Sequence, residues 1–274
     1  FQEITTTLLK KYCEAFYYKK KQDFELPNLE YQPLQEDDRN IVKEYNITVY
    51  DDGNQETVIA RLEDLVNNLK KAKEEGLLKG LDFASYAHGS FEVFNFERHL
   101  YAPLIYIGKG ETQIVASPVK LNEGEQQFVK DLKAYYEKNE AFFNDKELYL
   151  LRNRVKIGIG FFEAGNFYPD FIMWIVKGNK QYIVFIDPKG IRNIDGGEEN
   201  PKIQFYKKIK EIEHHMNNSD VVLNSFIVTP TRFSEIQKSW RGNVTKEQLE
   251  SCNVLFQNDD SNYIEKMLNK VYVL

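Results

Sequence analysis

The stretch FYPDFIMWIVKGNKQYIVFIDPKGIR, residues 167–192, decides the predicted fold and leads to the functional hypothesis. Two apolar runs flank the four residues KGNK at 177–180. A Gly-Asn pair between such runs is typical of a tight β-hairpin, because glycine supplies the positive φ of the turn. With 178–179 as the loop, residue 177 pairs with 180, and Asp170 then lies directly opposite Asp187 on one face of the hairpin. A register slip of one residue would place the two carboxylates on opposite faces.

Two aspartates opposite each other beside apolar strands are unfavourable without a partner. Cross-strand Cβ atoms lie roughly 4.5–5.5 Å apart, so like charges there destabilise the sheet, and an unpaired charge among apolar residues is costly. A divalent cation between Asp170 and Asp187 would remove the conflict, and carboxylate oxygens suit Mg²⁺, with Mn²⁺ as a substitute. Lys189 lies two residues after Asp187 and projects to the same face, where an ammonium can orient an attacking water. The alternative is that each aspartate is only the solvated end of a strand.

The neighbourhood of the two aspartates is basic. Seven basic and three acidic residues lie between Leu151 and Arg192, a local balance of +4 in a chain with a net charge of −6. Such a surface favours phosphate groups. The residues expected to contact a DNA backbone are Arg152, Arg154, Lys156, Arg192 and Gln204, although Gln204 also fits an ordinary water-facing position.

Two glutamates are further candidate metal ligands. Glu125 follows Asn122 by three residues, which is the spacing of a capping box at a helix start. Its position on the apolar face of that helix also points it toward the core, where a carboxylate could bind a metal. Glu163 could be a ligand across the turn that precedes Asp170, or an ordinary turn residue.

Hydrophobic periodicity predicts an α/β chain in two parts. From residue 121 onward the order is α-β-β-β-α-β, followed by a helix, a short strand and a helix. We expect 1–115 to be a mostly helical connector and 116–274 to be the functional domain. The elements expected are helices at 1–21, 57–75, 122–138 and 201–216 and strands at 47–50, 147–162, 167–176, 181–189 and 221–228.

Composition narrows the class of protein. The chain of 274 residues is 42% hydrophobic, which is enough for a core, and it lacks the run of about 18 apolar residues that a membrane helix needs. Cys13 and Cys252 form neither a disulfide framework nor a zinc motif, which fits a reducing cytoplasm. The chain starts with Phe1, which suggests a fragment of a longer protein.

The residues around the hairpin resemble a known nuclease motif. Asp170 preceded by proline, with Asp187-Pro188-Lys189 closing an apolar strand, resembles the PD-(D/E)xK motif, and the element order is similar to the restriction-endonuclease-like core. The segments LNEGEQQFVKDLKAYYE (121–137), FFEAGNFYPDFIMWIV (161–176) and YIVFIDPKGIRN (182–193) are similar to the C-terminal nuclease region of type III restriction subunits and related DEAD/DEAH helicase–nuclease proteins. The resemblance covers about residues 115–260.

The resemblance implies a Mg²⁺-dependent endonuclease that cuts double-stranded DNA in a restriction or phage-defence system. By position, Asp170 and Asp187 would hold the metal, Lys189 would position the attacking water, and Glu125 would match the acidic residue of the first helix. ATP would act only through a helicase motor on the same full-length polypeptide, because no phosphate-loop motif occurs here. A methyltransferase or specificity subunit could choose the target, and residues 1–115 would resemble the linker to the motor.

Two other functions remain open from the sequence. A non-catalytic DNA-binding or docking domain of a DNA translocase would use the same basic surface without cutting. Hydrolysis of a small phosphoester ranks last, because the sequence offers no glycine-rich cradle for a small phosphate.

Overall fold

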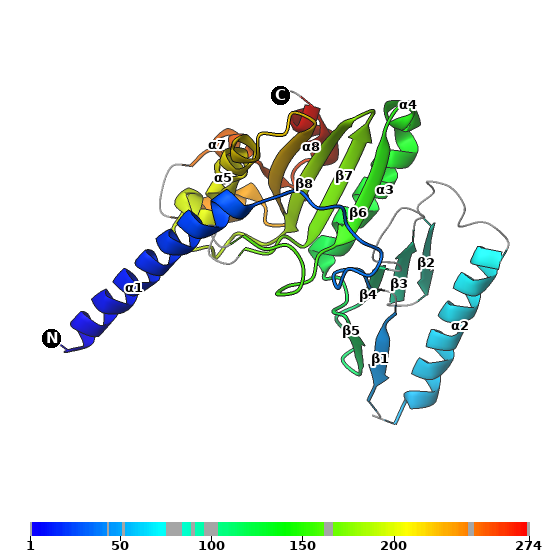
Figure 1. Cartoon of the computed structure of the whole chain (residues 1–274). Helices are drawn as coiled ribbons and strands as arrows, with labels where there is room; N and C mark the ends of the chain where they lie inside the picture. The colour runs from blue at the N-terminus through cyan, green and yellow to red at the C-terminus, as the bar shows by residue number, and fades with distance from the viewer. Residues whose placement is uncertain are drawn as a thin grey trace.

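The computed structural model describes residues 2–42, 44–50, 53–74, 84–88, 91–95, 104–161, 167–240 and 244–272. These residues form a mixed α/β protein with a central five-stranded sheet, two smaller sheets and flanking helices (Figure 1). No helix in the described part of the chain combines the length and the apolar character needed to cross a bilayer.

The central sheet has the strand order β10-β9-β8-β7-β6. The neighbours β6, β7 and β8 are antiparallel, whereas β9 is parallel to both β8 and β10. The return from β8 to the parallel strand β9 therefore runs through a helix, α5. The bounds of the strands are β6 Glu147–Arg152, β7 Phe171–Lys177, β8 Lys180–Pro188, β9 Val221–Thr229 and β10 Val254–Phe256.

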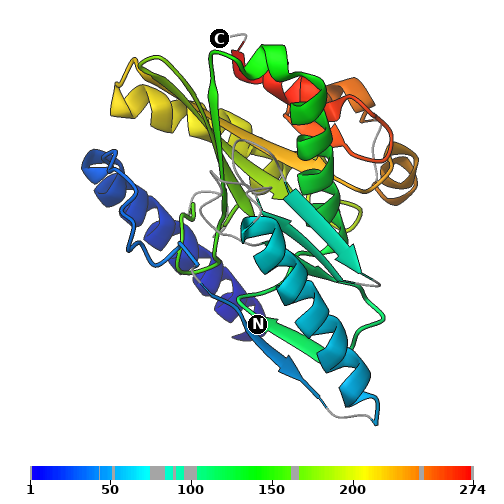
Figure 2. The same ribbon diagram turned by 90° about the vertical axis from the view of Figure 1, so that its right-hand side faces the viewer.

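Helices cover both faces of this sheet, because its central strands are apolar on both faces. On one face, Phe128 of α3 packs against Phe171 with ring centroids 5.3 Å apart, and α8 lies beside α3 (Figure 2). On the other face, Phe205 of α5 contacts Phe161, whose ring contacts Phe185. The helices of this part are α3 Glu123–Lys138, α4 Glu140–Phe143, α5 Pro201–Met216, α6 Phe233–Ser239, α7 Lys246–Ser251 and α8 Tyr263–Tyr272, with a 3-10 turn at Gly197–Glu199.

The predicted α-β-β-β-α-β order is confirmed, with two strand bounds corrected. The strand expected at 147–162 stops at Arg152, because the Asn153 side chain binds the Ile159 amide (3.0 Å), the Ile159 carbonyl (2.8 Å) and the Pro169 carbonyl (2.8 Å). These bonds fold residues 153–159 into a turn at the end of the sheet. Strand β7 also starts at Phe171 rather than at 167, since Phe167 forms an isolated bridge with Phe161.

The N-terminal part contains more strand than the prediction of a mostly helical connector. A two-stranded antiparallel sheet joins β1 to β5, and β5 crosses the expected boundary between 115 and 116. A three-stranded sheet has the order β2-β3-β4. The predicted helices are present, but Leu8, Tyr12 and Phe16 of α1 are more than half exposed, and α1 projects from the body in Figure 1. The elements are α1 Gln2–Glu25, a 3-10 turn at Leu26–Asn28, β1 Asn46–Val49, α2 Gln55–Glu74, β2 Ala84–His88, β3 Phe91–Asn95, β4 Leu104–Ile107 and β5 Ile114–Ser117.

Candidate active site

The β7–β8 hairpin has the predicted register. Lys177 pairs with Lys180, Phe171 pairs with Ile186, and Gly178 has the positive φ of 58° that the turn requires. Asp170 directly precedes Phe171 and Asp187 directly follows Ile186, so the same register brings Asp170 opposite Asp187. Because side chains alternate between the faces of a strand, both carboxyls belong to the same face of the hairpin. The predicted hairpin register is therefore confirmed, and the hydrogen bonding between the Asp170 and Asp187 side chains agrees with it.

Asp187 lies in the interior at the carboxyl end of β8. Asp187 is only 5% exposed, and its backbone pairs with Ile227 of the parallel strand β9. Burial raises the pKa of this carboxyl well above its usual range, and the charge and hydrogen bonding of Asp170 raise it further. The ammonium groups of Lys189 and Lys202 act in the opposite direction. The result is a carboxyl pair that strongly favours any additional positive charge.

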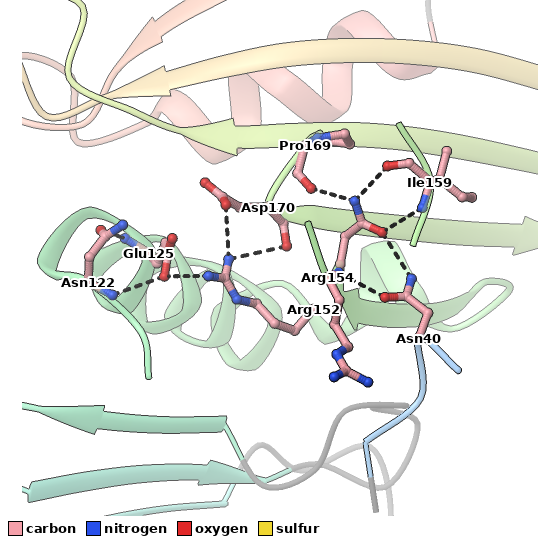
Figure 3. A network of polar contacts seen from close by, with 9 residues as sticks. Asn40, Asn122, Glu125, Arg152, Arg154, Ile159, Pro169 and Asp170 are labelled. Carbon is pink, nitrogen blue, oxygen red and sulfur yellow. Dashed lines mark hydrogen bonds and ion pairs between the residues drawn. The ribbon is translucent and has the colours of Figure 1, made fainter. Parts of the chain in front are cut away.

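Arg152 joins Asp170 to Glu125 across the end of the sheet (Figure 3). Its Nη2 lies 3.0 Å from Glu125 Oε2, and its Nη1 lies 3.3 Å from Asp170 Oδ1. Nη1 also donates to the Asp170 carbonyl at 3.2 Å, and the guanidinium lies 5.1 Å from the centre of the Phe171 ring. Arg152 is only 8% exposed. The expectation that it lies on a basic DNA-binding strand is therefore wrong, because β6 ends here and carries the guanidinium inward to two carboxylates.

Glu125 caps the first helix of the domain and also binds Arg152. The predicted capping box is present: Asn122 Oδ1 accepts from the Glu125 amide at 3.0 Å, and Glu125 Oε2 accepts from the Asn122 amide at 2.9 Å. Burial raises the pKa of Glu125 to about 7, against the opposing effect of Arg152. The capping role is thus confirmed, and the same carboxylate faces the site through Arg152 rather than through Asp187.

Two lysines interact electrostatically with the buried Asp187. Lys189 directly follows β8, and its backbone amide donates to the Val228 carbonyl at 3.0 Å. Lys202 is the second residue of α5, where the Asn200 side chain caps its amide at 2.9 Å. Burial lowers the pKa of Lys202, and the neighbouring Lys189 lowers it further, whereas Asp187 raises it. The site therefore has two adjacent ammonium groups.

Sequence reasoning missed Lys202. The signal was present, because Asn200-Pro201 marks the start of the next helix after the strand that ends at Asp187-Pro188. A side chain in that first helical turn lies near the end of the preceding strand.

The other predicted contact residues lie in the neighbouring loops and, for Gln204, in the first turn of α5. Arg154 donates through Nη1 to the Arg39 carbonyl at 2.8 Å. Lys156 and Arg192 are exposed. Gln204 donates to the Glu198 carbonyl at 2.7 Å and so stabilises the segment before α5. Glu163 lies outside the described residues.

The two aspartates suit a divalent cation, but a ready-made cage of three acidic ligands is not found. Among the residues that the structure describes, no group of three or more His, Cys, Asp or Glu side chains is arranged to hold a metal, and the Arg152 guanidinium lies between Glu125 and Asp170. Mg²⁺ in phosphate enzymes commonly uses one or two carboxylates and completes its shell with water and substrate phosphate. The donor set Asp170 and Asp187 fits that mode of binding.

The site contains equal numbers of acidic and basic side chains. Three carboxylates are opposed by three cationic side chains, so the fully ionised cluster has no net charge. A bound divalent cation would leave a net charge of +2, which favours a phosphodiester. The members of this cluster are Glu125, Asp170, Asp187, Arg152, Lys189 and Lys202.

Comparison with known proteins gives no matching family model, no matching curated protein and no matching solved structure. The functional conclusion therefore depends on the geometry and chemistry of the site itself.

Proposed function

We propose that residues 116–274 form a metal-dependent endodeoxyribonuclease of the PD-(D/E)xK type, with a restriction-endonuclease-like core. The observation that carries the proposal is the pairing of Asp170 with buried Asp187 on one face of the hairpin, with Lys189 acting on the same carboxyl. The α-β-β-β-α-β order and the resemblance of residues 115–260 to helicase-associated nucleases support it.

The residues divide the chemistry between them. Asp170 and Asp187 would hold Mg²⁺, or Mn²⁺ in its place, and such an ion when bound acidifies a water molecule and polarises the phosphate. The Lys189 ammonium would orient the attacking water and donate to a phosphoryl oxygen. Lys202 would add a second positive charge beside the same phosphate. In the overall hydrolysis, the water oxygen bonds to phosphorus, the P–O3′ bond breaks, and a proton goes to the departing oxygen.

The substrate and partners follow from the resemblance and from the surface charge. Double-stranded DNA is the proposed substrate, with exposed Lys156 and Arg192 near its backbone, so binding should weaken steeply with salt. We further propose a helicase motor on a longer polypeptide, through which alone ATP would act, and a methyltransferase or specificity subunit that selects the site. The cytoplasm is the proposed location.

The decisive experiment replaces Asp187 with alanine and follows plasmid cleavage in Mg²⁺ and Mn²⁺. Loss of a group that stabilises the transition state should lower the rate by about 10²–10³-fold or more. The matched control is Asp145→Ala, because Asp145 pairs with Lys146 and Lys177 at the other end of β7. Undiminished metal-dependent cleavage by the Asp187 variant would reject the proposal.

One observation favours a second candidate, a non-catalytic DNA-docking domain. The Arg152 guanidinium already neutralises Glu125 and Asp170, which is how a purely structural charge cluster would look. Calorimetric titration with Mn²⁺ separates the two functions. A nuclease should bind Mn²⁺ and lose that binding in Asp170→Ala, whereas a docking domain should show no binding in either protein.

A further inference from the structure

The buried guanidinium of Arg152 has a more specific function than charge neutralisation. We propose that Arg152 is a positioning residue of the nuclease site, which holds the Asp170 carboxylate in the orientation that faces Asp187. This inference rests on the proposed nuclease function and assigns Arg152 no contact with DNA.

The bonding pattern between Arg152 and Asp170 restrains both the backbone and the side chain of the aspartate. Nη1 lies 3.3 Å from Oδ1 and 3.2 Å from the carbonyl oxygen of the same residue. The carbonyl oxygen also accepts from the Asn153 amide at 2.8 Å. Asp170 precedes the first residue of β7 and so lies outside the paired residues of the β7–β8 ladder. Its position therefore depends on these contacts with the end of β6.

Arg152 is itself held on two further sides. Its Nη2 lies 3.0 Å from Glu125 Oε2, and that oxygen also accepts from the Asn122 amide at the start of α3. The Phe171 ring covers the guanidinium at 5.1 Å. A planar guanidinium presents its donors in a fixed fork, so the start of α3 sets the position of Asp170 through one rigid group.

A lysine at this position would keep the charge and lose the fork. A single ammonium on a flexible stem cannot reproduce the paired contacts from Nη1 and Nη2, so Arg152→Lys separates positioning from charge. Groups that orient a metal ligand typically change metal affinity or activity by about 10–100-fold when replaced.

The test measures Mn²⁺ affinity by calorimetry without DNA, and then cleavage rate, DNA affinity and the salt dependence of DNA binding. We expect Arg152→Lys to weaken Mn²⁺ binding and to lower the rate at saturating DNA by about 10–100-fold each. DNA affinity and its salt slope should stay at the wild-type values. Arg61→Lys is the matched control, because Arg61 pairs with Glu111 in the N-terminal part and should leave all four quantities unchanged.

The opposite pattern would overturn the inference. A DNA-contacting arginine would leave Mn²⁺ affinity and the saturated rate unchanged and would shift the salt slope by about one phosphate contact. Suppose that the wild-type protein binds Mn²⁺ and cleaves DNA. If Arg152→Lys then binds Mn²⁺ as tightly as the wild type does, only the positioning role is rejected. A wild-type protein that neither binds Mn²⁺ nor cleaves rejects the proposed function together with this inference. If Arg152→Lys unfolds at a lower temperature than the wild type, the double variant Arg152→Gln/Glu125→Gln is compared in the same measurements. It removes the positive charge of Arg152 and the negative charge of Glu125 together.

Discussion

Replacing Asp187 with asparagine should stabilise the metal-free protein while it removes cleavage. Asp187 is buried opposite Asp170, and its burial is the largest cause of the raised pKa of its carboxyl. Asparagine keeps the size and hydrogen-bonding capacity of the side chain and has no charge. The substitution therefore relieves a conflict that the folded protein tolerates for the sake of the proposed metal site.

The size of the gain follows from the spacing of the pair. Two unit charges about 5 Å apart, the separation of directly opposed strand residues, interact by about 3 kcal/mol at an effective dielectric constant of roughly 20. Lys189 and Lys202 offset part of this repulsion. The expected gain in the free energy of unfolding at neutral pH is about 1–3 kcal/mol, and each kcal/mol should raise Tm by about 2–4 °C.

The gain should depend on pH in a defined direction. A carboxyl whose folded-state pKa is raised favours folding fully only below the unfolded-state pKa of about 3.9, and that contribution is lost as the pH rises through the folded-state pKa. The wild type and Asp187→Asn should therefore converge toward pH 4 and differ most at neutral and alkaline pH.

Thermal and urea unfolding in EDTA between pH 4 and 8 would measure this difference. Asp145→Asn is the control, because Asp145 is exposed and paired at the opposite end of β7. Added Mn²⁺ at 100 times its Kd should stabilise the wild type by about 2.7 kcal/mol and leave the Asp187 variant unchanged. Equal or lower stability of Asp187→Asn in EDTA at pH 8 would refute the reasoning.

Three further predictions concern neighbouring residues. Because the pKa of Glu125 is raised to about 7 in the folded protein, the stability of the wild type should fall between about pH 4.5 and 7. Glu125→Gln can still cap α3, and its urea unfolding midpoint should depend less on pH over this range. A pH dependence equal to that of the wild type would contradict the buried, protonatable carboxyl. Lys202→Met should lower the single-turnover cleavage rate by about tenfold or more, whereas Lys207→Met, at an exposed position of the same helix, should not; equal rates in both variants would exclude Lys202 from the site. A Cβ at Gly158 would lie 2.1 Å from Asn153 Oδ1, so Gly158→Ala should lower the free energy of unfolding in urea by about 1–3 kcal/mol. Gly110 has open space around it, so Gly110→Ala should unfold like the wild type. Equal unfolding curves for the two variants would show that the turn at 153–159 accommodates the extra methyl group.

Most elements of the central sheet were predictable because their signals are local. The Gly178-Asn179 turn predicted the register of the β7–β8 hairpin, and the Asn122–Glu125 spacing predicted the capping box. Helix α5 begins at the predicted Pro201. The N-terminal part was harder, because short strands such as β1 and β5 pair across about 70 residues of sequence and carry weak periodicity.

The hairpin register was thus determined by the sequence alone, since one turn and a period of two suffice to place Asp170 and Asp187 on one face. The tertiary structure decided what surrounds them. Arg152 turned inward because β6 stops where the Asn153 side chain bonds to Ile159 and Pro169, and Lys202 reached the pair because α5 begins beside the end of β8. The positions of Arg152 and Lys202 both depend on tertiary contacts between distant segments at one end of the sheet. The periodicity of a strand or a helix carries no information about such contacts.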